Sequence, residues 1–225
     1  MKPFFIFGLV FLGLLTSCSH NVLDNKISIT TATNGLMKNP LVKFPVYLTD
    51  TLEARNTLEK KYNENLFIIH TGHLLNPNFS KNENEKILNA LANNQFDLVN
   101  LTLEDFVIAE AQGIQFSNYN QVFLNSSVID LGSDTLVNGK NVQAFAIHDG
   151  VAFIGLSDQL IDQNLPREKY IIDDYVLSVL KVKKIALKKA EPTPLRSFVI
   201  IHTLGSEINE VMERLPPNFI NSKAY

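Results

Sequence analysis

The chain has 225 residues and a formal net charge of −3, with 20 Lys and Arg against 23 Asp and Glu. This balance, together with the lack of any cluster of basic and aromatic residues, argues against a nucleic-acid-binding protein. The single cysteine rules out a disulfide within one chain, so the fold must be held together by its own hydrophobic core.

The N-terminus has the pattern of a signal peptide. Lys2 is followed by an apolar run over residues 3–15 and then by Thr16 and Ser17. A run of about a dozen residues is too short to cross a bilayer, which needs about 20. Residues 1–17 are therefore predicted to be a signal peptide that is removed, and not a permanent transmembrane helix.

The end of this segment indicates which kind of signal peptide it is. Leu15-Thr16-Ser17-Cys18 resembles the lipobox of bacterial lipoproteins, in which the cysteine is diacylated before cleavage. The resemblance implies that lipid on Cys18 holds the protein to a membrane, each buried CH₂ contributing about 0.8 kcal/mol. Ser19 stands where inner-membrane lipoproteins carry a retention Asp, so we expect the outer membrane, facing the periplasm. The alternative is an ordinary secretory signal with an accidental cysteine.

Residues 18–43 are rich in Asn, Ser, Thr and Lys, which predicts a lipid-anchored tether. From residue 44 to 225, short apolar runs alternate with amphipathic stretches, as is typical of βαβ units in one α/β domain with a largely parallel sheet. The runs predicted to be buried strands are residues 44–48, 66–69, 96–101, 122–124, 142–147, 151–156 and 198–201.

Local signals predict four further features. Ser80 and Glu83 form a capping-box pattern at the start of a short helix. His148-Asp149-Gly150 suits a hairpin turn between two of the strands. Asp173 and Asp174 open the longest helix, whose later turns carry several lysines, and Pro192 with Pro194 ends it. The lysines fit the helix dipole; the alternative is contact with anionic headgroups. A last helix is expected over residues 206–215.

Two segments carry the clearest family likeness. Phe123-Leu124-Asn125-Ser126-Ser127-Val128 and Val151-Ala152-Phe153-Ile154-Gly155-Leu156 are very like two strands of the metallophosphoesterase domain of bacterial 5′-nucleotidases, the calcineurin-like fold. The resemblance covers about residues 44–222. It implies an α/β, metallophosphoesterase-like layered sandwich with a central, mostly parallel mixed sheet. In that family, residues at strand ends hold two divalent metals about 3.5–4 Å apart, which clamp a phosphate and activate water.

Compared with the family's first two motifs, the chain keeps the frame and changes the ligands. Asp50 matches the first metal-binding Asp, but Leu52 stands where the neighbouring His belongs. In the second motif, His73 takes the place of the Asp that bridges the two metals.

The later motifs depart in the same way. Leu103 and Glu104 stand where the family has a metal-binding Asn and the catalytic His. Thr203 takes a later His position, with His202 one residue early, and no counterpart of the last Gly-His-x-His motif occurs near residues 218–221. The resemblance therefore implies the fold more strongly than the chemistry.

Five polar residues remain as a candidate site: Asp50, His73, Glu104, Asp105 and His202. We expect them near the carboxyl ends of strands, where α/β proteins bind ligands. Two-metal chemistry requires several hard oxygen and imidazole ligands together, and leucine offers no lone pair. The sequence therefore assigns no catalytic residue, no metal ligand and no cofactor, and the histidines are alternatively strand-end residues in local hydrogen bonds.

Three functions remain open. The leading hypothesis is a membrane-anchored protein whose domain has lost catalysis and binds an envelope protein or a small ligand. The second is an active metal-dependent phosphoesterase or nucleotidase that uses the five residues as unusual ligands and needs a divalent metal. The third is an unrelated α/β domain, which the absence of a sandwich with paired sheets would reveal.

We expect Cys18→Ala to abolish acylation and to leave the protein uncleaved or soluble, because the lipobox requires the thiol. Metabolic labelling with a fatty acid, followed by membrane fractionation, measures this. The wild-type protein should carry the label and appear in the outer-membrane fraction. An unlabelled wild-type protein would contradict the lipoprotein hypothesis, and recovery in the inner membrane alone would contradict the predicted location.

Overall fold

The computed structural model describes residues 67–93, 96–159, 164–166, 168–192, 194–216 and 219, with residues 53, 56, 57 and 59–61. The predicted signal peptide, Cys18, the tether, the predicted strand 44–48 and Asp50 lie outside the described residues. Within the described part of the chain, no helix has the length and apolar character needed to cross a membrane.

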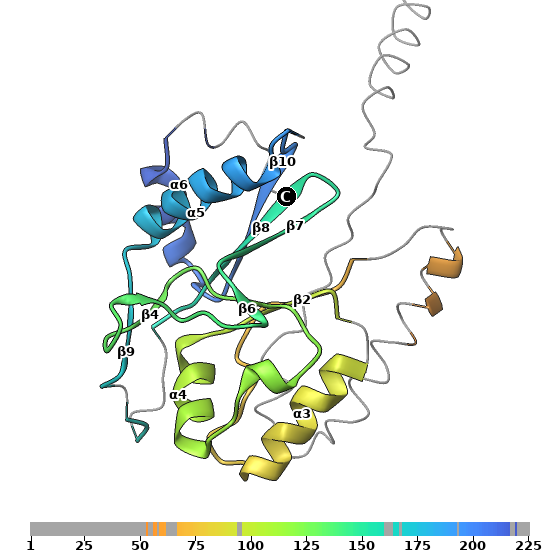
Figure 1. The fold of residues 1–225 in the computed structure, drawn as a ribbon, viewed down its shortest axis with the longest axis vertical. Coiled ribbons are helices and arrows are strands. Elements are labelled where there is room, and N and C mark those ends of the chain that lie inside the picture. Colours follow the sequence, from red (N-terminus) through yellow and green to blue (C-terminus); the bar gives the residue numbers. More distant parts are fainter. Residues whose placement is uncertain are drawn as a thin grey trace, which may run out of the picture.

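Two sheets pack face to face in the middle of the molecule (Figure 1). The first has the order β1-β2-β3-β6 and is parallel throughout. The second has the order β10-β8-β7, in which β10 is parallel and β7 antiparallel to β8. Their strands are β1 (Ile69–His70), β2 (Leu98–Asn100), β3 (Phe123–Leu124), β6 (Val142–Gln143), β7 (Phe145–His148), β8 (Val151–Leu156) and β10 (Ser197–His202). These paired sheets form the sandwich that the family resemblance implies.

Helices cover the outer face of each sheet (Figure 1). On the first sheet lie α3 (Lys81–Asn93) and α4 (Leu103–Gln112), whose Leu88 and Phe106 join the same hydrophobic cluster as Val99 of β2. On the second lie α5 (Tyr175–Ala190) and α6 (Glu207–Arg214), whose Val179 and Val211 pack with Ile154 of β8. The result is a four-layer arrangement of helices, sheet, sheet and helices.

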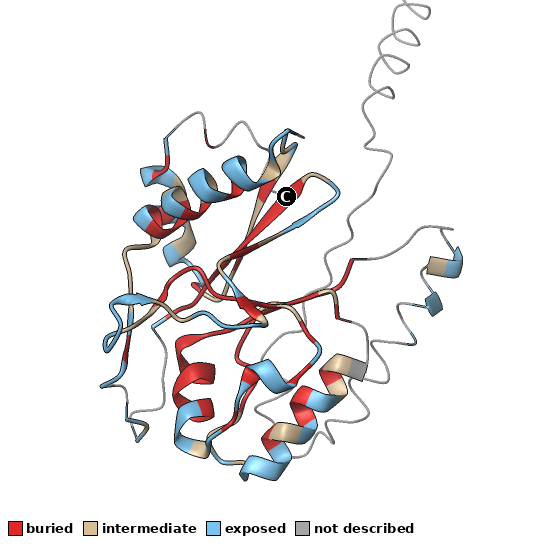
Figure 2. Cartoon of the chain, viewed as in Figure 1, coloured by how far each residue is buried: buried red, intermediate tan, exposed pale blue. Residues whose placement is uncertain are grey.

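The position of β8 between two hydrophobic layers explains its continuous apolar sequence. All six of its residues are buried (Figure 2). Because side chains alternate between the two faces of a strand, Val151 and Phe153 pack between the sheets, and Ala152 and Ile154 pack under α5 and α6. A strand that is covered on both faces has no polar alternation, and its continuous apolar run follows from this position.

The predicted helix starts are confirmed. The Ser80 backbone N–H donates to Glu83 Oε2 at 2.8 Å, and the Glu83 backbone N–H donates to Ser80 Oγ at 3.4 Å, which completes the capping box before α3. Asp174 caps α5 by accepting the backbone N–H of Leu177 at 2.9 Å. The last helix, α6, lies within the range predicted for it.

The prediction of one strand over residues 142–147 is wrong. The chain leaves the first sheet after β6 and enters the second with β7, so a single apolar run supplies strands to both sheets. His148 is also not a turn residue, because it pairs with Val151 at the end of β7. Asp149 and Gly150 alone form the turn, both with positive φ (47° and 74°), as a two-residue hairpin turn requires.

A third, small antiparallel sheet was not predicted. It has the order β5-β4-β9 and consists of β4 (Val128–Asp130), β5 (Thr135–Leu136) and β9 (Tyr170–Ile172). A single-turn 3₁₀ helix over Phe116–Asn118 precedes β3. These strands are short and partly exposed, so their sequences lack a continuous apolar run.

We expect Gly155→Ala to lower the free energy of unfolding by about 1–3 kcal/mol, because an added methyl group overpacks the space between the sheets. A Cβ at Gly155 would lie 2.9 Å from the Leu124 Cβ and would clash with the Asn100 side chain. Gly139→Ala is the matched control, since a Cβ there meets no atom within 4 Å. Urea unfolding compares the two; equal stabilities would contradict close packing at this end of the sandwich.

Candidate functional site

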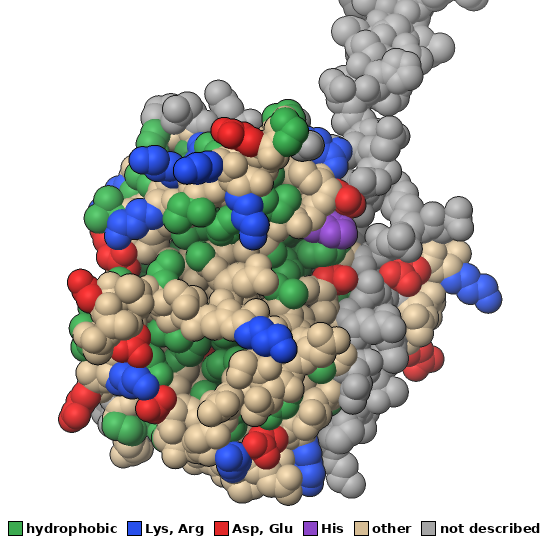
Figure 3. Space-filling model, in the orientation of Figure 1, with side chains coloured by type: hydrophobic (Ala, Val, Ile, Leu, Met, Phe, Trp, Pro, Cys, Tyr) green, Lys and Arg blue, Asp and Glu red, His purple; other side chains and the backbone are tan. Residues whose placement is uncertain are grey.

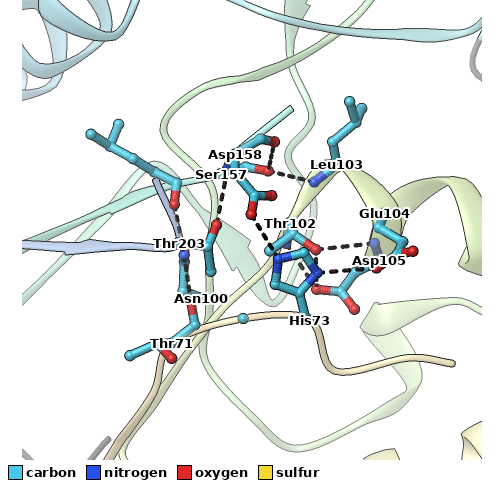
Figure 4. A network of polar contacts seen from close by, with 12 residues as sticks. Thr71, His73, Asn100, Thr102, Leu103, Glu104, Asp105, Ser157, Asp158 and Thr203 are labelled. Atoms are coloured by element: carbon cyan, nitrogen blue, oxygen red, sulfur yellow. Dashed lines mark hydrogen bonds and ion pairs between the residues drawn. The ribbon is translucent and has the colours of Figure 1, made fainter. Parts of the chain in front are cut away.

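A buried polar network lies where the loops after β1, β2, β8 and β10 come together (Figure 4). The Asn100 amide nitrogen, at the end of β2, donates to the carbonyls of Thr71 and Leu156, both at 2.9 Å. The Asp158 backbone N–H donates to Thr203 Oγ1 at 2.9 Å. Carboxyl ends of strands from both sheets therefore meet here, as expected for a ligand site of an α/β protein.

His73 is the centre of this network. Its Nδ1 lies 3.0 Å from Glu104 Oε2 and its Nε2 lies 2.8 Å from Asp158 Oδ2. All three side chains are buried, His73 with an exposed fraction of 5%. The backbone of His73 has a φ of 53°, a left-handed conformation that is uncommon outside glycine. Glu104 and Asp158 bind the ring from opposite sides and so fix its orientation.

The electrostatics favour a protonated ring. Burial lowers the pKa of His73, but the hydrogen bonds to Asp158 and Glu104 and the charges of Asp105 and Asp158 outweigh it and raise the pKa to about 9. Burial and the charge of His73 lower the pKa of His70 to about 4. At neutral pH, His73 is therefore an imidazolium that donates through both nitrogens, and His70 is neutral.

The Asp105 side chain accepts hydrogen bonds mainly from backbone N–H groups. Its Oδ1 accepts the backbone N–H groups of Leu74 and Leu75, both at 2.7 Å. Its Oδ2 accepts the Thr102 backbone N–H at 2.9 Å and the Thr102 hydroxyl at 2.8 Å, which forms a capping box at the start of α4. Burial raises the pKa of Asp105 in spite of these bonds. Asp105 thus fastens the segment after His73 to α4.

The structure brings together only part of the predicted candidate site. His73 and Glu104 are in direct contact, and Asp105 lies beside them. His202 is half-buried at the end of β10, and burial lowers its pKa. Its buried Nδ1 has no hydrogen-bond partner within the part of the chain that the structure describes. Asp50 lies outside the described residues, so its place in the site stays a prediction.

The prediction missed Asp158, which shares His73 with Glu104. The available signal was its position: Ser157 and Asp158 directly follow the buried run 151–156, at the carboxyl end of a strand. Ser157 also takes part, because its hydroxyl accepts the backbone N–H of Leu103 at 2.6 Å. Leu103, at a family ligand position, is buried with an exposed fraction of 4%.

The donors in this network do not fit a two-metal centre. Both ring nitrogens of His73 lie within hydrogen-bond distance of a carboxylate, which raises its pKa, and the two oxygens of Asp105 each accept two hydrogen bonds. Across the described residues, no group of three or more His, Cys, Asp or Glu side chains is placed to hold a metal ion. An imidazolium offers no lone pair to a metal and repels it.

Comparison with known proteins supports the fold. No family model and no curated protein matches the chain. Among solved structures, the sulfate thiohydrolase SoxB of Thermus thermophilus in complex with glycerol aligns with a TM-score of 0.57 and 14% identity over 75% of this chain and 31% of its own. The NAD nucleotidase NadN of Haemophilus influenzae aligns with a TM-score of 0.50 and 18% identity over 73% of this chain and 30% of its own.

Both similar structures are metallophosphoesterase or 5′-nucleotidase-type folds, and this chain spans less than a third of the length of either. At these identities, the likeness concerns the fold. The predicted metallophosphoesterase-like α/β sandwich is therefore confirmed. The sandwich with paired sheets, whose absence would have favoured an unrelated α/β domain, is present.

We expect the stability of the protein to fall as the pH rises from 6.5 to 9. The pKa of His73 is raised from 6.5 to about 9 on folding, so its ion pairs stabilise the fold fully below pH 6.5 and are lost as the pH passes the folded value. The loss is on the order of 3 kcal/mol. Urea unfolding across this range measures it. His73→Gln should remove most of the slope, and the exposed His148→Gln should keep it; equal slopes in all three proteins would contradict the raised pKa.

Proposed function

We propose that this protein is a lipid-anchored envelope protein whose metallophosphoesterase-like domain has lost hydrolysis and acts as a binding or interaction module. The anchor is the acylated Cys18 in the outer membrane, facing the periplasm. The partner is an envelope protein or a small ligand, and not a nucleic acid. One observation carries the proposal: the His73 ring is held between Glu104 and Asp158, one carboxylate at each ring nitrogen.

This ion triad uses one oxygen of each carboxylate, Glu104 Oε2 and Asp158 Oδ2. A divalent metal that binds these two oxygens must displace the His73 ring and break two charge-assisted hydrogen bonds. Breaking a buried ion pair typically costs about 3–5 kcal/mol. Metal binding at this place therefore competes with an interaction that already stabilises the fold.

Residues at other family ligand positions have structural contacts instead. Leu103 contributes an apolar side chain to the core below the first sheet. The Thr203 hydroxyl accepts the backbone N–H of Asp158 and so holds the second carboxylate in place. Replacements of this kind maintain the sandwich and supply neither a metal clamp nor an activated water, each of which contributes several kcal/mol to catalysis in two-metal enzymes.

A second function, metal-dependent phosphoester hydrolysis with unusual ligands, rests on a different observation. Asp158 Oδ1, Asn100 Oδ1 and His202 Nδ1 are buried at the same end of the sandwich, and none of them has a hydrogen-bond partner among the described residues. Buried polar atoms of this kind cost free energy unless something satisfies them. A divalent cation held by these atoms together with Asp50 would do so.

We expect the purified chain to contain no stoichiometric transition metal and to hydrolyse neither nucleotides nor phosphate bis-esters with added Mn²⁺, Zn²⁺ or Mg²⁺. Elemental analysis and a hydrolysis assay measure this on the wild type, on a Glu104→Gln, Asp158→Asn double variant, and on the exposed Glu213→Gln as a control. Turnover that the wild type and Glu213→Gln show and the double variant lacks would establish phosphoester hydrolysis with unusual metal ligands. Turnover that survives in the double variant would come from a contaminant.

A further inference from the structure

The outer face of α5 carries an unusual number of exposed apolar side chains. Six large hydrophobic residues of the described chain are exposed, and three of them lie on this helix. They are Leu177, Ile185 and Leu187, with exposed fractions of 52%, 55% and 44%. The other three, Leu131, Ile147 and Ile171, belong to other parts of the molecule.

The same face is strongly basic. Exposed lysines stand at positions 181, 184, 188 and 189, and the helix contains no acidic residue. Figure 3 shows lysine side chains next to hydrophobic ones over this helix. With 100° per residue in a helix, Leu177, Lys181, Lys184 and Lys188 follow one line, and Ile185 and Leu187 lie on its two sides. We call this surface the α5 face.

The helix dipole explains only part of this composition. Lysines in the last turn interact favourably with the helix C-terminus, and Lys188 and Lys189 are placed there. The dipole gives no reason for the exposed leucine and isoleucine side chains. The solvent-facing side of a surface helix is usually polar. Burying a Leu or Ile side chain is worth about 1.5–3 kcal/mol, so a partner that covers these residues would gain free energy.

A groove of about 610 Å³ continues the apolar flank of the α5 face. Leu180, Leu187 and Pro216 line it together with three lysines and Glu191. One of these lysines, Lys183, has its ammonium 4.2 Å from the centre of the Phe219 ring. With three lysines against one carboxylate, the groove combines apolar walls with a net positive charge, which suits a molecule that has an apolar part and an anionic head.

We propose that the α5 face docks on the surface of a bilayer that contains anionic lipids. Helix faces that mix lysine with exposed leucine and isoleucine lie in the interface of such membranes, because the apolar side chains enter the acyl boundary and each lysine gains about 1 kcal/mol from the negative surface. The predicted lipid on Cys18 would keep this face close to a bilayer. Docking itself needs no acyl chain, so this proposal is independent of the proposals that the protein is a lipoprotein and that its domain has lost hydrolysis.

The test is sedimentation of the chain from residue 19 onward, which contains every described helix and strand, with lipid vesicles. It should bind vesicles of phosphatidylcholine with roughly 30% phosphatidylglycerol, bind pure phosphatidylcholine poorly, and bind less as salt rises. Lys184→Gln with Lys188→Gln should weaken binding on the order of tenfold. Ile185→Ser with Leu187→Ser should weaken binding by roughly several-fold, because less apolar surface enters the acyl boundary.

Matched controls use residues away from α5. Lys86→Gln with Lys140→Gln removes the same charge from exposed positions, and Leu131→Ser with Ile171→Ser removes the same exposed apolar surface. Both control proteins should bind within about twofold of the wild type. The absence of binding to the anionic vesicles would overturn the proposal, as would control variants that weaken binding as much as the α5 variants do.

Discussion

The salt bridges of His73 with Glu104 and Asp158 hold together the end of the sandwich at which the polar network lies. The ring follows β1 of the first sheet, Glu104 begins α4, and Asp158 follows β8 of the second sheet, so one imidazolium connects both sheets and a helix. An imidazolium between two carboxylates is stable in a buried place only because each charge has a close partner of opposite sign. The neighbouring hydrogen bonds of Asp105 fix the loop that carries the ring.

The layers of the fold and the polar network depend on different interactions. The continuous apolar run of β8, the hydrogen-bonded strand pairs and the close contact at Gly155 define the four layers, and none of these needs a metal. The ligand positions lie in loops at one end, where a change of side chain leaves the layers intact. A chain can thus keep this architecture while Leu103 and Thr203 serve packing and backbone positioning.

Sequence patterns predicted the parts of the fold that interactions between neighbouring residues determine. The run 151–156, the Ser80 cap and the Asp174 cap are each specified by neighbouring residues, and all three are observed. The ion triad is different, because His73 and Asp158 are 85 positions apart in the chain. No period or short motif encodes such a contact, so Asp158 was missed although its strand was predicted. Helix α4 was missed because its first turn was interpreted as a ligand motif.

The polar network lies near the start of α5, whereas Lys184 and Lys188 of the α5 face lie in its later turns. The first turn of α5 is close to the network, since burial and the charges of Glu207 and Asp158 raise the pKa of Tyr175 to about 12. Lys188 lies 13 positions further on, which is about 20 Å along a helix that rises 1.5 Å per residue. A domain that rests on a bilayer through the later turns of α5 therefore holds the loops around His73 away from the lipid. In that orientation, the end of the sandwich that carries the polar network points away from the bilayer.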